Sequence, residues 1–145
     1  MSRVLAIANQ KGGVGKTTTS VNLAASLAAT KRLTMLIDLD PQGNATMGSG
    51  VDKRRLNRSS YDVLMGECGI EDALVRDVAA GYHLLPANAD LTGAEVGLLE
   101  ELGRELRLRH ALEQLRERYA YVIIDCPPSL NMLTVNALVA ADAVV

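Results

Sequence analysis

The sequence has few cysteines, almost no net charge and no long apolar run. Its two cysteines, Cys68 and Cys126, lie far apart, and their positions predict neither a disulfide nor a metal centre built on cysteine. Such sparse use of cysteine is typical of a protein in a reducing cytosol.

The formal net charge of −2 excludes a chain that binds nucleic acid through its overall charge. The densest basic run, KRRLNR at residues 53–58, could contact phosphate, but an exposed charged loop is the commoner outcome for such a run. Any affinity for DNA is therefore expected to be local or conditional.

No window of the sequence reaches the length of a membrane span, and the apolar stretch near Met1 is too short for a signal peptide. A chain of 145 residues with 48% hydrophobic content can bury one core. We therefore expect a single α/β domain over residues 1–145, cytoplasmic and without a membrane partner.

Short apolar runs without a helical stripe predict strands at 3–9, 33–38, 82–88 and 121–125. The segment after the first glycines has helical spacing, as do residues 131–141, and a short helix is expected near 61–65. This alternation predicts a doubly wound, mostly parallel sheet with helices on both faces.

Residues 97–119 are predicted to form one long amphipathic helix. Its inward face would carry Leu99, Leu102, Leu106, Leu112 and Leu115. The pairs Glu100 with Arg104 and Glu105 with Arg109 have the i,i+4 spacing of a salt-bridged outer face.

The sequence ends in the apolar, β-branched residues 142–145, which are typical of the start of another strand. We therefore expect this chain to be the N-terminal portion of a larger domain.

Two carboxylates and a glycine-rich loop are expected to meet at one edge of the sheet. Asp38 and Asp125 each end a predicted strand, and the glycine loop leaves the first strand at the same, carboxyl edge. There Gly12, Gly13 and Gly15 would let the backbone curl so that N–H groups point at phosphate oxygens.

The residues after these glycines have the chemistry of a phosphate-binding loop that uses a metal ion. Lys16 would supply a charge to the β- and γ-phosphates, and the Thr17 hydroxyl a ligand for Mg²⁺. Asp125 would hold a metal-bound water.

A dinucleotide site is the rival interpretation of a glycine loop followed by an acid. Asp38 lies about 20 residues beyond the loop, where a ribose-binding acid belongs. However, the pattern read from Gly13 requires a third glycine where the sequence has Thr18, and it gives no role to Lys16 and Thr17. A phosphate-loop NTPase is therefore favoured.

At these residues the sequence resembles the ParA/MinD family of deviant Walker A ATPases, and most closely its Soj-like chromosome-partitioning branch. The family motif K-G-G-x-G-K-[ST] is matched in full by residues 11–17. DLDPQGNAT at 38–46 looks like switch I, IIDCPPSL at 123–130 looks like Walker B with switch II, and residues 84–96 resemble a further block. The resemblance covers essentially the whole chain and the first half to three-fifths of such a protein.

One departure lies at residues 29–34, ATKRLT, where relatives usually have a glycine in the turn before the second strand. This difference concerns packing and not chemistry.

The resemblance implies ATP and Mg²⁺ as cofactors and Lys11, Lys16 and Asp40 as catalytic residues. Lys11 would reach the ATP of a second copy of the chain, and Asp40 would orient the attacking water. Asp38 would lie near the metal-bound waters, so that Thr17, Asp38 and Asp125 form the metal set, and Gly43 would give switch I its freedom to move. The nucleotide contacts would be Lys11, Gly12, Gly13, Val14, Gly15, Lys16, Thr17 and Thr18.

The same resemblance implies an ATP-dependent homodimer that binds DNA non-specifically on the nucleoid. A ParB/Spo0J-like partner would stimulate hydrolysis. Most DNA contacts of such proteins lie outside the part that this sequence matches.

Several alternatives remain open at this point. Lys11 could be a solvated loop charge, and Asp40 a turn-former before Pro41. The whole chain could be an inactive fragment or a phosphate-binding interaction module, or a membrane-cycling ATPase of the MinD type, although the DPQGNAT segment favours partitioning. Cys126 is expected to be a buried apolar residue and not a cluster ligand, and His83 and His110 to be packing or surface residues.

Overall fold

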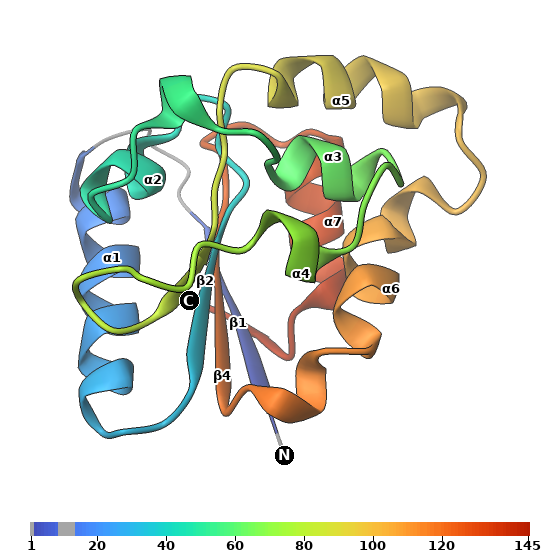
Figure 1. The fold of residues 1–145 in the computed structure, drawn as a ribbon. Coiled ribbons are helices and arrows are strands. Elements are labelled where there is room, and N and C mark those ends of the chain that lie inside the picture. The colour runs from blue at the N-terminus through green and yellow to red at the C-terminus, as the bar shows by residue number, and fades with distance from the viewer. Residues whose placement is uncertain (1, 9–13) are drawn as a thin grey trace.

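A computed structural model describes residues 2–8 and 14–145, and within 14–17 it describes the backbone alone. Five parallel strands form one sheet in the order β3-β2-β4-β1-β5 (Figure 1). The strands are β1 (Arg3–Ile7), β2 (Thr34–Asp38), β3 (His83–Leu85), β4 (Tyr121–Asp125) and β5 (Ala143–Val144). The predicted parallel sheet is confirmed, and the strands lie where the apolar runs placed them.

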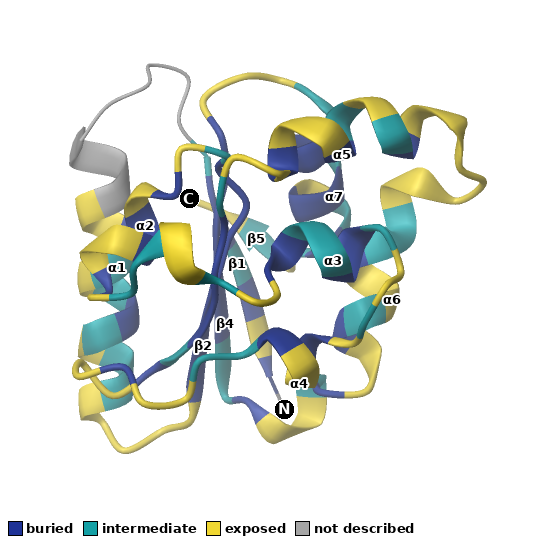
Figure 2. Cartoon of the chain, turned by 45° about the horizontal axis from the view of Figure 1, so that its top comes forward, coloured by how far each residue is buried: buried dark blue, intermediate teal, exposed yellow. Residues whose placement is uncertain are grey.

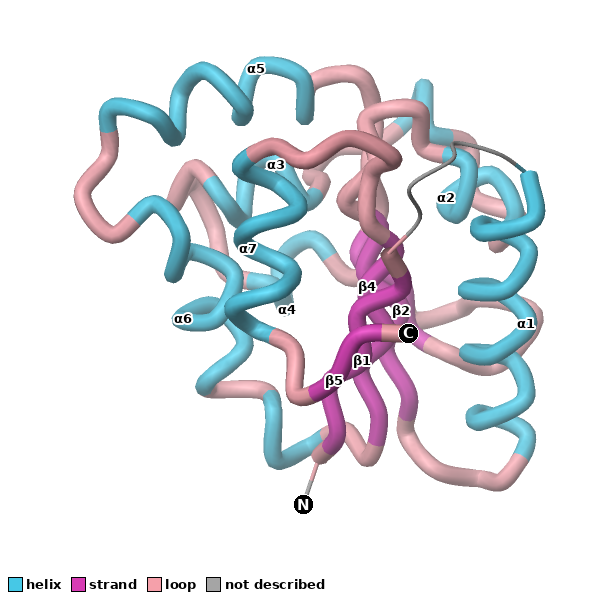
Figure 3. Tube along the Cα trace, turned by 180° about the vertical axis from the view of Figure 1, so that it is seen from behind, coloured by secondary structure: helices cyan, strands magenta, loops and turns pink. Residues whose placement is uncertain are grey.

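Helices cover both faces of this sheet. The α-helices are α1 (Val14–Ala29), α2 (Asn44–Gly48), α3 (Ser60–Leu64), α4 (Ile70–Ala73), α5 (Leu91–Gly97), α6 (Arg107–Glu113) and α7 (Met132–Ala140). The 3-10 turns are η1 (Lys53–Arg55), η2 (Leu98–Glu100), η3 (Arg104–Leu106) and η4 (Arg116–Arg118). As Figures 1 and 3 show, α1 and α2 lie on one side of the sheet and α3 to α7 on the other. This is the doubly wound arrangement that the sequence predicts.

Each central strand contributes side chains to two separate cores. In β2, Met35 and Ile37 pack toward the side of α3 to α7, whereas Leu36 packs toward α1. All five residues of β2 are buried, as expected for a parallel strand covered on both faces (Figure 2).

The core is built without phenylalanine or tryptophan. Tyr82 is the largest side chain that is completely buried among the described residues. Its hydroxyl lies 2.5 Å from that of Ser49, the residue that follows α2. Tyr119 is the other buried aromatic residue of the described core, so the packing depends mainly on aliphatic side chains.

The prediction of one helix over residues 97–119 is wrong. The segment is broken into η2, η3, α6 and η4, and Gly103 has a φ of +66°. Glycine adopts this left-handed conformation without the steric cost of a β-carbon, and it is a common helix terminator.

The break changes which leucines of this segment are buried. Leu112 and Leu115 are buried as predicted, but Leu99 and Leu102 are exposed by 56% and 96%. The ion pair at the break joins Arg107 to Glu101 at 3.0 Å and is not one of the predicted i,i+4 pairs.

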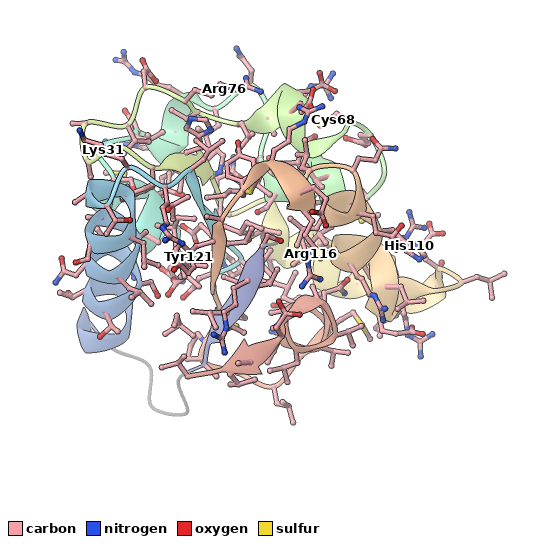
Figure 4. The ribbon with its side chains drawn as sticks, turned by 90° about the horizontal axis from the view of Figure 1, so that it is seen from below. Lys31, Cys68, Arg76, His110, Arg116 and Tyr121 are labelled. Atoms are coloured by element: carbon pink, nitrogen blue, oxygen red, sulfur yellow. The ribbon has the colours of Figure 1, made fainter. Side chains whose placement is uncertain are left out.

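The opposite edge of the sheet, where the strands begin, is closed by ionic and backbone contacts. Arg116 donates to the Asp142 carboxylate at 2.6 Å, and the same carboxylate accepts from the Val4 N–H at 2.8 Å. Figure 4 views the molecule from this end, with Arg116 near β5 and Lys31 beside the end of α1. These contacts attach β5 to the start of β1.

The turn after α1 accounts for the departure at residues 29–34. Lys31 has a φ of 66°, and among the described residues it alone has a positive φ without being glycine. Its N–H donates to the Ala28 carbonyl, as at a helix end that closes in the left-handed conformation. This is the position at which a glycine removes the clash of the β-carbon.

We predict that Lys31→Gly stabilises the fold by about 0.5–1 kcal/mol. Relief of the left-handed strain is worth about 1–2 kcal/mol, and the greater freedom of glycine in the unfolded chain offsets part of it. Urea unfolding followed by circular dichroism measures the change. Lys31→Ala keeps a β-carbon and should give no such gain, and Arg32→Gly, next to it at a negative φ, should lower stability. A loss of stability in Lys31→Gly would contradict this account.

Candidate functional site

Three strand ends meet at the carboxyl edge of the sheet. Asp125 is paired in register with Ile7 of β1 on one side and with Asp38 of β2 on the other. The chain leaves β1 at this edge and re-enters the described part at Val14, the first residue of α1. The two acids and the N-terminus of α1 are therefore brought to one edge, as the sequence predicts.

The structure describes only part of the predicted phosphate loop. Lys11, Gly12 and Gly13 lie outside the described residues. Val14, Gly15, Lys16 and Thr17 form the start of α1, where helix N–H groups have no partner within the helix and suit an anion. Thr18 follows them on α1 and is exposed.

Asp125 is completely buried and is bonded to the helix that follows the loop. Its carboxylate accepts a hydrogen bond of 2.6 Å from the hydroxyl of Ser20. Ser20 is also buried and lies one helical turn beyond Lys16. The sequence did not point to Ser20, because the residue that it contacts lies 105 positions away in the chain.

Asp38 is buried as well, and its carboxylate is surrounded by donors from its own loop. One oxygen accepts from the Asp40 N–H at 3.0 Å. The other accepts from the Thr46 N–H at 2.9 Å and from the Thr46 hydroxyl at 2.7 Å. Thr46 was not predicted as a site residue.

Burial, and after it the neighbouring charge of Asp125, raise the pKa of Asp38 from 3.8 to about 7. The hydrogen bonds from Thr46 and Asp40 act in the opposite direction, since they favour the ionised form. The two neighbouring buried carboxylates therefore repel each other when both are ionised. A divalent cation would relieve this repulsion, because carboxylate oxygens are the ligands that it prefers.

Asp40 lies at the start of the loop that follows β2. Its carboxylate accepts from the Gln42 N–H at 3.0 Å, and its carbonyl accepts from the Gly43 N–H at 2.8 Å. It is exposed by only 5%. The turn before α2 is thus closed by Asp40 itself, which is compatible with both roles considered for this residue.

Gly43 is required at its position by close packing. It has a φ of +66°, and a β-carbon there would lie 2.9 Å from the Ala87 carbonyl oxygen. The left-handed conformation and the missing β-carbon of Gly43 therefore allow the loop to pack closely against Ala87, just after β3.

The second predicted loop follows β4. Cys126 is buried, and its N–H donates to the Ile7 carbonyl at 3.2 Å, so the chain continues beside β1. Asn131 caps α7 by accepting from Leu133 and Thr134, and its amide donates to Glu95 of α5 at 2.9 Å. The segment after Asp125 is thereby attached to α5.

The remaining candidates have structural surroundings. Arg54 and Arg55 of the basic run are exposed and lie 3.2 and 3.6 Å from the Asp52 carboxylate. His83 lies 2.7 Å from the Tyr119 hydroxyl, and His110 is exposed on α6. Among the described residues, no three histidine, cysteine or acidic side chains are grouped as a metal site would require.

The chain belongs to the AAA_31 family of AAA domains, whose model matches residues 2–145. It is 56% identical to the chromosome partitioning protein ParA of Caulobacter vibrioides, over 98% of this chain and 54% of that protein. It is 48% identical to the sporulation initiation inhibitor protein Soj of Bacillus subtilis, over 100% of this chain and 57% of that protein. The resemblance to the partitioning ATPases is confirmed.

Solved structures give the same result for the fold. A Mycobacterium smegmatis protein named cobyrinic acid a,c-diamide synthase, crystallised with ADP and magnesium, has a TM-score of 0.96 and 51% identity. The match covers 99% of this chain and 58% of that one. The fold is that of the phosphate-loop NTPases, and the chain spans little more than half the length of the relatives it matches.

No helix in the described part of the chain has both the length and the apolar character needed to cross a membrane.

The raised pKa of Asp38 predicts that stability falls as pH rises. In the unfolded chain the carboxyl ionises near 3.8, whereas in the folded protein it keeps its proton to about 7. Between these values the folded state binds the extra proton, so the contribution of Asp38 is fully present below the unfolded pKa and is lost as pH rises through the folded pKa. Urea midpoints in metal-free buffer should therefore decrease from about pH 5 to about pH 7.

Asp125→Asn is the matched variant, because its amide oxygen still accepts from Ser20 while the neighbouring charge is removed. The pKa of Asp38 should then be lower and the decrease with pH smaller. An unchanged slope in Asp125→Asn would show that the two carboxyl groups do not interact.

Proposed function

We propose that the protein binds ATP with Mg²⁺ at the carboxyl edge of the sheet and hydrolyses it as a chromosome- or plasmid-partitioning ATPase, with residues 1–145 as part of its NTPase domain. The observation that carries the proposal is the meeting of the start of α1, Asp38 and Asp125 at one edge. The start of α1 at this edge, residues 14–17, is the second half of the K-G-G-x-G-K-[ST] motif.

The residues at this edge suit a nucleotide with its metal ion. The M. smegmatis relative was crystallised with ADP and magnesium and also with an ATP analogue and magnesium. Mg²⁺ keeps several of its waters and uses few protein ligands, which fits a site where Asp38 and Asp125 are neighbours on adjacent strands. The bound ion would neutralise charge on the phosphates.

Lys16 and Thr17 would then bind the phosphates and the metal ion from the start of α1. Asp125, fixed by Ser20, would hold a metal-bound water, and Asp38 would lie behind it as an outer acceptor, because its oxygens already accept from Asp40 and Thr46. Asp40, at the edge of the same loop, would orient the attacking water.

Lys11 would complete the site of a second copy in an ATP-dependent homodimer. A cation delivered only on dimerisation makes hydrolysis and assembly a single event, because charge accumulates on the γ-phosphate oxygens in the transition state. The dimer would bind DNA non-specifically in the cytoplasm, on the nucleoid, and a ParB/Spo0J-like partner would stimulate hydrolysis.

The name of the M. smegmatis structure suggests a different substrate, cobyrinic acid. Sequence identity does not decide between the functions that the two names suggest, because Caulobacter ParA and the M. smegmatis protein are 56% and 51% identical to this chain. ATP turnover that responds to DNA supports partitioning. Turnover that requires cobyrinic acid and ignores DNA would instead favour the second name.

We predict that Asp40→Ala retains ATP binding and dimer formation but loses at least about 100-fold in turnover, the usual range for removal of a positioned acid or base. Phosphate release and binding of a fluorescent ATP analogue measure the two properties separately. Asp77→Ala, an exposed acid elsewhere, is the control. Lys16→Ala should lose nucleotide binding itself, and unchanged affinity there would contradict the assignment of the loop.

We predict that Lys11→Ala binds ATP as a monomer but no longer forms ATP-dependent dimers. The reason is that its charge acts on the nucleotide of the partner copy and not on its own. Size-exclusion chromatography with light scattering, with and without ATP, measures the assembly. Lys31→Ala removes a lysine far from the edge and should dimerise normally. Normal dimers in Lys11→Ala would leave the lysine as a solvated loop charge.

A further inference from the structure

Thr46 occupies a buried position between the end of β2 and the end of β3. Its side chain has no solvent exposure. The hydroxyl donates to the Asp38 carboxylate at 2.7 Å and accepts from the Ala87 N–H at 2.9 Å. One hydroxyl thus uses both its donor and its acceptor capacity to join two strand ends.

The same carboxylate closes the loop between Asp38 and Thr46 into a ring. It accepts from the Asp40 N–H near the start of the loop and from the Thr46 N–H and hydroxyl at its end. Buried hydrogen bonds to a carboxylate are among the stronger ones in proteins. The backbone of Asp40 is therefore held by an acid whose own orientation depends on Thr46.

The end of β3, to which Thr46 is bonded, is itself fixed. The Pro86 carbonyl accepts from the Ser60 N–H at 2.8 Å, and the Ser60 hydroxyl donates to the Asp38 carbonyl at 2.9 Å. Gly43 packs against the Ala87 carbonyl on the other side. Thr46 therefore connects the loop to the segment directly after β3, which is itself hydrogen-bonded to Ser60 of α3 through Pro86.

We propose that Thr46 is a positioning residue for hydrolysis: its hydroxyl orients the Asp38 carboxylate, and through it holds Asp40 at the carboxyl edge of the sheet. This inference rests on the proposed function, since it assigns Thr46 a role in that same site. Thr46 acts through Asp38 and Asp40 and touches neither the nucleotide nor the water in this account.

Thr46→Val and Thr46→Ser separate the hydroxyl from the packing. Valine keeps the shape of threonine but removes the bond to Asp38 and leaves the Ala87 N–H without its acceptor, whereas serine keeps the hydroxyl and loses only a methyl group. Thr34→Val is the matched control. Like Thr46, Thr34 is buried, and its hydroxyl donates to the Arg32 carbonyl at 3.0 Å. Thr34 is the first residue of β2 and therefore lies at the end of the strand opposite to Asp38.

The first measurement is hydrogen exchange by mass spectrometry on the protein without nucleotide. We expect peptides covering residues 39–46 and 87 to exchange at least about tenfold faster in Thr46→Val than in wild type. Thr46→Ser should exchange at close to the wild-type rate, and Thr34→Val should leave these peptides unchanged. Equal exchange in Thr46→Val and wild type would overturn the proposal without any reference to ATP.

The second measurement is ATP turnover. We expect kcat to fall at least about tenfold in Thr46→Val with little change in KM, and Thr46→Ser to recover most of it. A purely structural role would instead lower the activity of Thr34→Val and Thr46→Val alike. Faster exchange with an unchanged kcat would overturn the positioning role.

The two measurements also distinguish this inference from the proposed function. If wild type turns over no ATP while Thr46→Val exchanges faster, the proposed function fails and the hydrolytic role of Thr46 fails with it, although its attachment of the loop is supported. If wild type turns over ATP and Thr46→Val retains full activity, the proposed function stands and the inference about Thr46 fails.

Discussion

The Asp38 carboxylate is completely buried at the end of β2, and the loop that follows the strand donates hydrogen bonds to it. It accepts from the backbone of Asp40 and from both the backbone and the hydroxyl of Thr46. Because a buried charge is costly unless it is hydrogen-bonded, the loop cannot leave this carboxylate without exposing it or leaving it unsatisfied. The positions of α2 and of the turn at Gly43 follow from this constraint.

A second buried carboxylate, that of Asp125, connects the sheet to α1. Asp125 ends β4 and accepts from Ser20 of α1. Beyond Asp125, the chain passes beside β1 and reaches α7, whose capping residue Asn131 contacts Glu95 of α5. The two carboxylates therefore hold α1 and the loop before α2, both on one face of the sheet, while the chain beyond Asp125 leads to helices on the other face.

Much of the fold could be predicted because parallel strands buried on both faces appear as continuous apolar runs, as β2 and β4 do. The prediction of one helix over residues 97–119 was wrong. The leucine spacing is helical on both sides of Gly103, but the left-handed backbone of that glycine separates the two halves. Asp38 and Asp125 were found because each ends an apolar run. Ser20 and Thr46 were not, since a hydroxyl has no sequence pattern that shows which distant carboxylate it will meet.

The aliphatic core also determines how the protein can be observed. With no tryptophan in the sequence, its near-ultraviolet fluorescence comes from four tyrosines. Of these, Tyr82 is completely buried, and its hydroxyl lies next to that of Ser49, the residue after α2, which follows the loop that Asp38 organises. The phenol is thus a built-in optical probe of this helix, and a rearrangement of the loop can be followed by tyrosine emission without attaching a dye.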